Sequence, residues 1–217
     1  MDIQLLCRNS LVVLFILGFY LFIAKTQDEK GYIRKWHLIG CLAFSFLVTA
    51  IVTITGVTPL SGFHTDLRLG DINWNPITGI AELFELTPMF GVVNVFGNII
   101  LFMPIGFFLP LLCRKNQRFG RTVLYGFLFS LLIEIWQLFL CRGTDIVDLM
   151  TNTLGTAAGY GCYLLFCKWF PAFSACFYNK NKKAKRTEQL QIAIAIFLPV
   201  LVTILLGFID RVNYGIV

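Results

Sequence analysis

Long apolar runs separated by short polar segments are the feature of this 217-residue chain that most limits its fold. A helix that crosses the roughly 30 Å hydrocarbon core of a bilayer needs about 17–25 mainly apolar residues. Hydrophobic residues make up 57% of the chain and charged residues only 14%, whereas soluble domains carry roughly 25% charged residues. An ordinary soluble fold is therefore excluded. The predicted spans are Ser10–Ala24, Leu38–Val57, Val92–Leu112, Val123–Cys141, Ile146–Phe166 and Ile192–Ile209.

Backbone geometry in lipid decides the type of secondary structure. Peptide N–H and C=O groups have no water to pair with inside the bilayer, so a single spanning segment must pair them internally as a helix. The sequence therefore predicts an all-α, polytopic membrane bundle of about six transmembrane helices. The first span is short unless it also includes Leu5, Leu6 and Cys7, which precede Arg8 and Asn9.

Lysine and arginine residues gather in alternate loops, which predicts the orientation of the bundle. Fourteen of the 18 lie in segments 25–35, 114–121 and 168–186. Loops on the cytoplasmic side of a membrane carry an excess of these residues. We therefore expect these three segments in the cytoplasm, and both termini and the 58–91 loop outside. Basic residues in this position also attract anionic lipid headgroups.

The net charge of +6 does not indicate nucleic-acid binding. The basic run Lys180–Arg186 contains no aromatic residues on which bases could stack. The seven cysteines contain no C-x-x-C pair, so their pattern favours neither a zinc site nor a disulfide framework. We therefore expect membrane lipids as partners, and no nucleic acid, metal or other cofactor.

Several polar residues lie within or beside the third, fourth and fifth predicted spans. Many are three or four residues apart, a spacing that places side chains on one face of a helix. They are Asn94 and Asn98 in the third span, Glu134 and Gln137 in the fourth, Asp148 and Asn152 in the fifth, and Arg142 and Asp145 between the last two.

In the predicted topology, the polar faces of spans three, four and five all lie in the external leaflet. At a rise of about 1.5 Å per residue, Glu134, Asn152 and Asn98 each lie roughly 9–10 Å below the outer end of their span. The sequence therefore predicts an outward-facing site shared by three helices. A shallower layer consists of Gln137, Asp148 and Asn94, with Arg142 and Asp145 at the rim.

The energetic cost of a buried charge indicates which of these residues carry function. A carboxylate at the bilayer centre costs from about 2.5 kcal/mol upward, so such groups usually face a protein-lined cavity and mark function. For Glu134 we favour function over a structural hydrogen bond between helices. Asp145 and Asp148 are equally compatible with capping the helix that follows. Gly155 and Gly159 form a G-x-x-x-G motif, which favours close helix contact over ligand binding.

Four motifs follow one another along the chain. They are Asn73-Trp74-Asn75-Pro76, the string from Asn94 to Gly106, Glu134-x-x-Gln137, and Arg142-x-x-Asp145-x-x-Asp148-x-x-x-Asn152-x-x-Gly155. Together, over roughly residues 70–165, they resemble the VanZ-like family of bacterial membrane proteins. The resemblance implies a multi-pass protein of the bacterial plasma membrane, in a family named for glycopeptide resistance and especially for resistance to teicoplanin.

This resemblance divides the chain into four predicted parts. Residues 1–69 hold two N-terminal spans and the start of the external loop, and residues 70–166 form the VanZ-like core with spans three to five. Residues 167–189 are a basic cytoplasmic loop, and residues 190–217 hold the last span.

Three functions are compatible with the pattern. In the first, the outward site binds or modifies an amphipathic molecule such as a lipid-linked cell-wall intermediate, with Glu134, Asp145 and Asp148 as candidate catalytic groups. The candidate substrate-binding residues are Asn94, Asn98, Gln137, Arg142 and Asn152. The second function is a small proton-coupled transporter or flippase. The third is a non-catalytic scaffold that shields a cell-wall target from glycopeptides. The sequence leaves open whether the protein is an enzyme.

Overall fold

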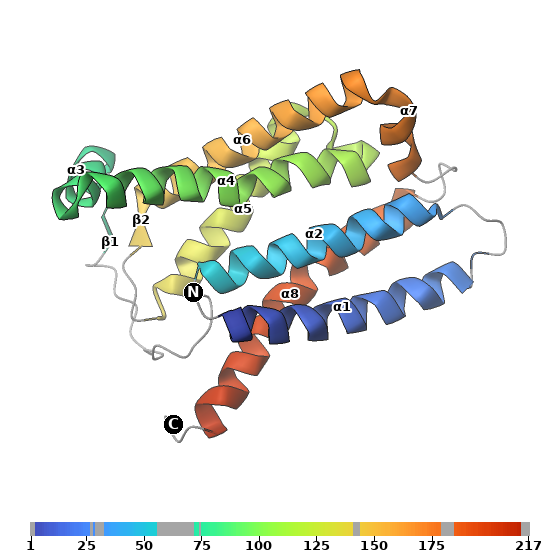
Figure 1. Ribbon diagram of the computed structural model, residues 1–217, viewed down its shortest axis with the longest axis horizontal. Coiled ribbons are helices and arrows are strands. Elements are labelled where there is room, and N and C mark those ends of the chain that lie inside the picture. Colours follow the sequence, from blue (N-terminus) through green and yellow to red (C-terminus); the bar gives the residue numbers. More distant parts are fainter. Residues whose placement is uncertain are drawn as a thin grey trace.

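Long helices make up most of the computed structural model, which describes residues 3–26, 28, 33–55, 72–73, 75–140, 144–178 and 185–213 (Figure 1). The elements are α1 (Ile3–Thr26), α2 (Lys35–Ile54), β1 (Ile72–Asn73), α3 (Pro76–Leu86), α4 (Pro88–Leu112), the 3₁₀ turn η3 (Arg114–Asn116), α5 (Phe119–Gln137), β2 (Thr144–Asp145), α6 (Ile146–Trp169), α7 (Pro171–Ser174), the 3₁₀ turn η4 (Ala175–Phe177) and α8 (Lys185–Asn213).

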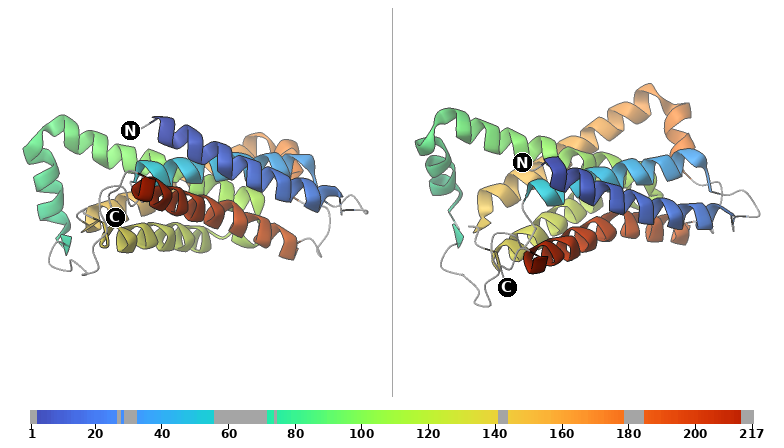
Figure 2. Two further views of the ribbon diagram at one scale, coloured as in Figure 1. Left: turned by 90° about the horizontal axis from the view of Figure 1, so that it is seen from below. Right: turned by 60° about the horizontal axis from the view of Figure 1, so that its bottom comes forward.

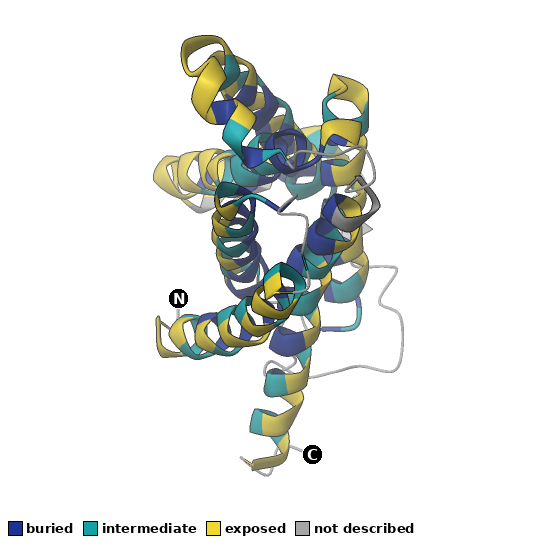
Figure 3. Ribbon diagram, turned by 90° about the vertical axis from the view of Figure 1, so that its right-hand side faces the viewer, coloured by how far each residue is buried: buried dark blue, intermediate teal, exposed yellow. Residues whose placement is uncertain are grey.

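The prediction of a polytopic helical membrane bundle is confirmed. Among the described residues, α1, α2, α4, α5 and α8 are long and apolar enough to cross a membrane. The remaining predicted span, the fifth along the chain, is the 24-residue helix α6, which runs along α4 (Figure 1). Its polar residues make it less apolar than the other five helices, although its length is sufficient for a span. Most exposed residues lie on the outward faces of the helices, as a membrane protein requires (Figure 3).

The first helix begins earlier than the apolar run Ser10–Ala24 suggested. It starts at Ile3 and includes Arg8 and Asn9. Arg8 is tolerated there because its guanidinium donates two hydrogen bonds of 2.7 Å to the carboxylate of Asp210 in α8. This ion pair also places the start of α1 beside the end of α8, at one end of the bundle (Figure 2).

The opposite end of the bundle carries the basic loops. The start of α2 lies beside the start of α8 there, where His37 Nε2 is 2.9 Å from Gln191 Oε1. Lys25 lies in the last turn of α1 at this end, and Arg114 follows α4 there. The described basic residues in the last turn of α1 and directly after α4 therefore lie at one end of the bundle. We call this end the basic end and the opposite one the outer end; that the basic end faces the cytoplasm stays a prediction.

The segment between α2 and α4, which was predicted to be an external loop, contains a helix that the sequence analysis did not predict. Helix α3 occupies Pro76–Leu86, with Pro76 in its first turn and the Asn75 side chain accepting a 3.0 Å hydrogen bond from the backbone N–H of Ile77. Pro88 likewise begins α4. Proline suits the first turn of a helix because the amide it lacks would have no partner there. Pro76 and Pro88 therefore each start a helix.

Helix α5 ends before the predicted boundary at Cys141. Its last residue is Gln137, after which Leu138 and Phe139 turn. The apolar composition of this segment gave no sign of a turn. Leu140 is fully buried, so these residues pack inside the protein and do not extend the helix in lipid.

Helices α4 and α6 run in parallel and touch through their backbones. A Cβ added to Gly155 would overlap the carbonyl of Ile99, and one added to Gly159 would overlap the carbonyl of Met103. From the other side, a Cβ at Gly106 would overlap the backbone of α6. The prediction that the G-x-x-x-G motif permits close helix contact is confirmed. This contact holds the polar faces of the two helices together.

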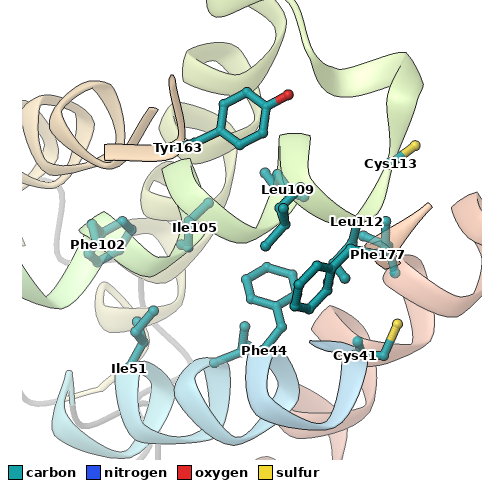
Figure 4. Packing of buried hydrophobic residues seen from close by; sticks show 14 of the residues in the cluster. Cys41, Phe44, Ile51, Phe102, Ile105, Leu109, Leu112, Cys113, Tyr163 and Phe177 are labelled. Atoms are coloured by element: carbon teal, nitrogen blue, oxygen red, sulfur yellow. The ribbon is translucent and has the colours of Figure 1, made fainter. Parts of the chain in front are cut away.

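The apolar core lies between α2 and α4. Phe44 and Ile51 from α2 face Ile105 and Leu109 from α4, and all four are buried (Figure 4). Phe44 also stacks on Phe108, with ring centroids 5.7 Å apart. The core thus joins the N-terminal helices to the three helices that carry the predicted site.

Candidate functional site

A short pair of strands holds two chain segments together at the outer end. Strands β1 and β2 are parallel, with Ile72 opposite Thr144 and Asn73 opposite Asp145. The backbone of Asp145 is therefore fixed directly before α6, beside the segment that leads into α3. The side chain of Asp145 and the whole of Arg142 lie outside the described part of the chain.

Asn98 and Asp148 join α4 to α6. The Asn98 amide Nδ2 donates a 2.7 Å hydrogen bond to Asp148 Oδ1 and also contacts Asn94 Oδ1 at 3.3 Å. All three side chains are half-buried. The amide of Asn98 therefore orients a carboxylate that remains accessible, and Asn94 lies one helical turn nearer the outer end.

Glu134 belongs to a small-to-polar stripe on α5 that faces α6. Gly126 contacts Thr156 of α6, and the Ser130 hydroxyl accepts a 2.9 Å hydrogen bond from Asn152 Nδ2. Glu134 continues this stripe at the same four-residue interval. Its side chain is only 4% exposed, so its carboxyl group is enclosed by protein.

Gln137 connects α5 to a fourth helix. Its amide Nε2 donates a 2.7 Å hydrogen bond to the carbonyl oxygen of Thr55, the residue that caps the end of α2. The carbonyls in the last turn of a helix lack partners within the helix. The amide group of Gln137 therefore stabilises the outer end of α2, a role that the sequence analysis did not assign.

The structure changes the register of the predicted layers. Asn98 and Asn152 were expected at one depth with Glu134. Asn98 instead bonds Asp148, from the shallower layer, and Asn152 bonds Ser130, one turn deeper than Glu134. Equal distances from the predicted helix ends were the wrong measure, because α5 ends four residues earlier than predicted and α4 begins four residues earlier, at Pro88.

The site contains two carboxyl groups in different surroundings, and amide groups that are oriented by hydrogen bonds to neighbouring side chains. Asp148 is half-buried and accepts a hydrogen bond from Asn98, whereas Glu134 is enclosed. Asn152 is 2% exposed, and its Oδ1 has no hydrogen-bond partner within the part of the chain that the structure describes. A buried acceptor without a partner is uncommon in proteins. This set of groups can bind hydroxyl, amide or ammonium groups.

Comparison with known proteins identifies the family. The model of the VanZ/LLP1 family matches residues 36–167, more than half of the chain. The chain belongs to the VanZ/LLP1 family. No curated protein and no solved structure matches it. The VanZ/LLP1 region runs from α2 to α6 and contains every candidate site residue, so the resemblance seen in the sequence is confirmed and the chain is a membrane protein of this family.

A second buried polar cluster lies at the basic end, partly outside the VanZ/LLP1 region. His37 is fully buried on α2, with Nδ1 donating to the Phe177 carbonyl oxygen at 2.8 Å and Nε2 2.9 Å from Gln191 Oε1. Glu188, one turn before Gln191 on α8, is 2% exposed. The sequence analysis missed this cluster because it assigns residues 167–189 to a basic cytoplasmic loop and predicts no buried contact there. The only signal was the proximity of both segments to the same membrane surface.

Two hydrogen-bonded tyrosines lie at the basic end of the VanZ/LLP1 region. The hydroxyl of Tyr178 accepts a 2.8 Å hydrogen bond from Gln117 and lies 3.2 Å from the hydroxyl of Tyr163. Burial raises the pKa of Tyr178 and also that of the nearby Cys113 thiol. Both groups therefore stay neutral at physiological pH. The hydrogen bond from Gln117 to Tyr178 holds the loop between α4 and α5 against the end of η4.

Proposed function

We propose that the polar residues of α4, α5 and α6 bind the headgroup of an amphipathic cell-envelope molecule, such as a lipid-linked cell-wall intermediate, at the outer face of the bacterial plasma membrane. The observation that carries this proposal is the buried carboxyl group of Glu134, placed on the α5 stripe that contacts α6. Keeping an ionisable group at such a position costs free energy, and proteins mostly do so where a ligand or proton is handled.

The surroundings of the site support an amphipathic ligand. Helix α3 covers the outer end of α4, where Phe84 packs on Gly91. Ile77 of α3 and Met89 of α4 are 78% and 72% exposed. Large exposed apolar side chains beside a polar site suit a molecule that has both a lipid chain and a polar headgroup. Asp148 and Asn98 would contact the headgroup nearer the membrane surface, and Glu134 would contact it at a more buried position.

Binding is favoured over proton-coupled transport by the composition of the region between the two polar clusters. Below the Asn152–Ser130 pair, the buried hydroxyl groups of Thr156 and Thr122 donate to the backbone carbonyls of Asn152 and Asn116, and neither hydroxyl is an ionisable group that relays protons. Proton-coupled transporters carry chains of ionisable residues along their path. A site whose two carboxyl groups, Asp148 and Glu134, both lie toward the outer end suits recognition from outside.

The family's link to glycopeptides suggests which molecule is bound. A lipid-linked cell-wall intermediate held in the outer site would be less accessible to teicoplanin. In a glycopeptide-susceptible bacterium, the wild-type chain would then lower susceptibility. Glu134→Gln, made at equal membrane abundance, would not.

Asp148→Asn is expected to reduce the bound headgroup about five- to tenfold while preserving the fold. Asparagine keeps the oxygen that accepts from Asn98 but loses the charge, and a hydrogen bond to a charged group contributes about 1 kcal/mol more than one to a neutral group. Wild-type and variant protein would be purified from bacterial membranes, and the copurified small molecules would be compared by mass spectrometry.

The matched control for this variant is Thr153→Val. Thr153 lies on α6 and donates to Leu149 O within its own helix at 2.7 Å, so it has no part in the proposed site. A molecule enriched with wild type and Thr153→Val but depleted with Asp148→Asn supports the proposal. Identical extracts from all three proteins would overturn it.

A further inference from the structure

An apolar groove separates α5 from α8 on the side of the bundle away from α6. It comprises two cavities of about 390 and 240 Å³. Both are lined by Phe129 and Leu132 of α5 and by Phe197 of α8, so they lie side by side along the groove. The larger cavity is within the usual range of about 300–1,000 Å³ for ligand sites.

Residues of the α2–α4 core form the floor of the larger cavity. Phe44, Ile105 and Leu109 line it and are the same side chains that pack α2 against α4 (Figure 4). The flanking helices α5 and α8 both qualify as membrane-spanning. The groove therefore lies at the depth of the lipid hydrocarbon, where the available apolar ligand is an acyl chain.

The length of the larger cavity corresponds to one leaflet. Its lining on α8 extends from Gln189 to Phe197, which is roughly 12 Å at 1.5 Å per residue. One leaflet contributes about half of the roughly 30 Å hydrocarbon core. The cavity begins at Asn116 and Gln189, at the basic end, and continues toward the middle of the membrane.

Basic residues surround the polar mouth of this cavity. Asn116 is the last residue of η3, directly after Lys115 and two residues before Arg118, and both of these side chains are exposed. Arg114 is held over the ring of Tyr178, 5.2 Å from its centroid. Cationic side chains at a membrane surface attract anionic lipid headgroups.

We propose that this groove binds one acyl chain of an anionic phospholipid from the leaflet at the basic end, with the phosphate between Lys115 and Arg118. This lipid site is separate from the outer headgroup site and does not depend on its function. The apolar wall selects a lipid, and the charge at the mouth selects an anionic one. A bound lipid would also join α5 to α8 across the groove.

Ala193→Phe tests the apolar part of the proposal. Ala193 lines the larger cavity, so a phenyl ring there would occupy the space of the acyl chain. The matched control is Ala158→Phe, because Ala158 is exposed on α6 and lies outside the groove. Detergent-purified proteins would be titrated with palmitoyl-oleoyl phosphatidylglycerol or phosphatidylcholine, and bound lipids counted by native mass spectrometry.

We expect wild type and Ala158→Phe to retain one phosphatidylglycerol and Ala193→Phe to bind it about tenfold more weakly. Lys115→Gln and Arg118→Gln, which leave the groove intact, should each weaken phosphatidylglycerol about fivefold and leave phosphatidylcholine unchanged. Equal phosphatidylglycerol binding by wild type and Ala193→Phe would overturn the proposal. A wild-type dimer that Ala193→Phe converts to monomers would also overturn it, since a second copy would then be the occupant.

Discussion

Gly159→Ala will lower the thermal midpoint of the purified protein by about 5–10 °C, which reflects about 2–3 kcal/mol of overpacking. The added methyl group would overlap the carbonyl of Met103 in α4. Neither backbone can yield without separating α4 from α6, which lie in direct backbone contact. Because Asn98 and Asp148 meet across this same interface, ligand binding at the outer site should fall together with stability.

Gly161→Ala is the matched control in the same helix. A Cβ at Gly161 meets nothing within 4 Å, and alanine favours a helix over glycine by up to about 1 kcal/mol. Its midpoint should therefore equal or slightly exceed that of wild type, as followed by size-exclusion chromatography of heated samples. Equal midpoints for Gly159→Ala and Gly161→Ala would show that α4 and α6 are not in backbone contact.

Glu134→Gln will reduce binding of the headgroup at least about tenfold, the second large effect that we expect. Glutamine has the same shape but cannot ionise, and loss of a charge-assisted hydrogen bond costs about 1.5–3 kcal/mol. The measurement is the equilibrium binding of the molecule that copurifies with wild type, followed by mass spectrometry of the retained ligand.

The control for Glu134→Gln is Glu188→Gln. Glu188 is also a buried carboxyl group, at 2% exposure, but lies at the basic end of α8. Binding that is lost in Glu134→Gln and kept in Glu188→Gln assigns the effect to the outer site. Wild-type affinity in Glu134→Gln would remove the carboxyl group from the binding mechanism and favour a purely structural role.

Most of the fold followed from hydropathy, because bilayer thickness imposes a length that is readable in a sequence. The apolar runs predicted the ends of α2, α4 and α6 to within four residues. The 11-residue helix α3 was missed because it is shorter than a span and lies in the segment that was predicted to be the external loop. Arg8 similarly hid the start of α1, since its partner Asp210 lies 202 residues away.

The sequence predicted which helix faces carry the candidate site, but not how far each helix is shifted along its neighbour. Three- and four-residue spacing correctly put Asn94 with Asn98, and it placed Glu134 on a buried face. The spacing within one helix says nothing about its vertical offset from the next. That offset depends on contacts such as Gly159 on Met103, and for this reason the pairing of Asn152 with Ser130 was not predictable.

The most direct test of the outer site is photo-crosslinking in living bacteria from a photoreactive amino acid at position 94 or 93. Asn94 contacts Asn98 at the proposed site, whereas Val93 beside it is 60% exposed. Position 94 should capture one discrete amphipathic cell-envelope molecule, and position 93 only the bulk phospholipids. The same mixture of bulk phospholipids at both positions would contradict a headgroup site between α4, α5 and α6.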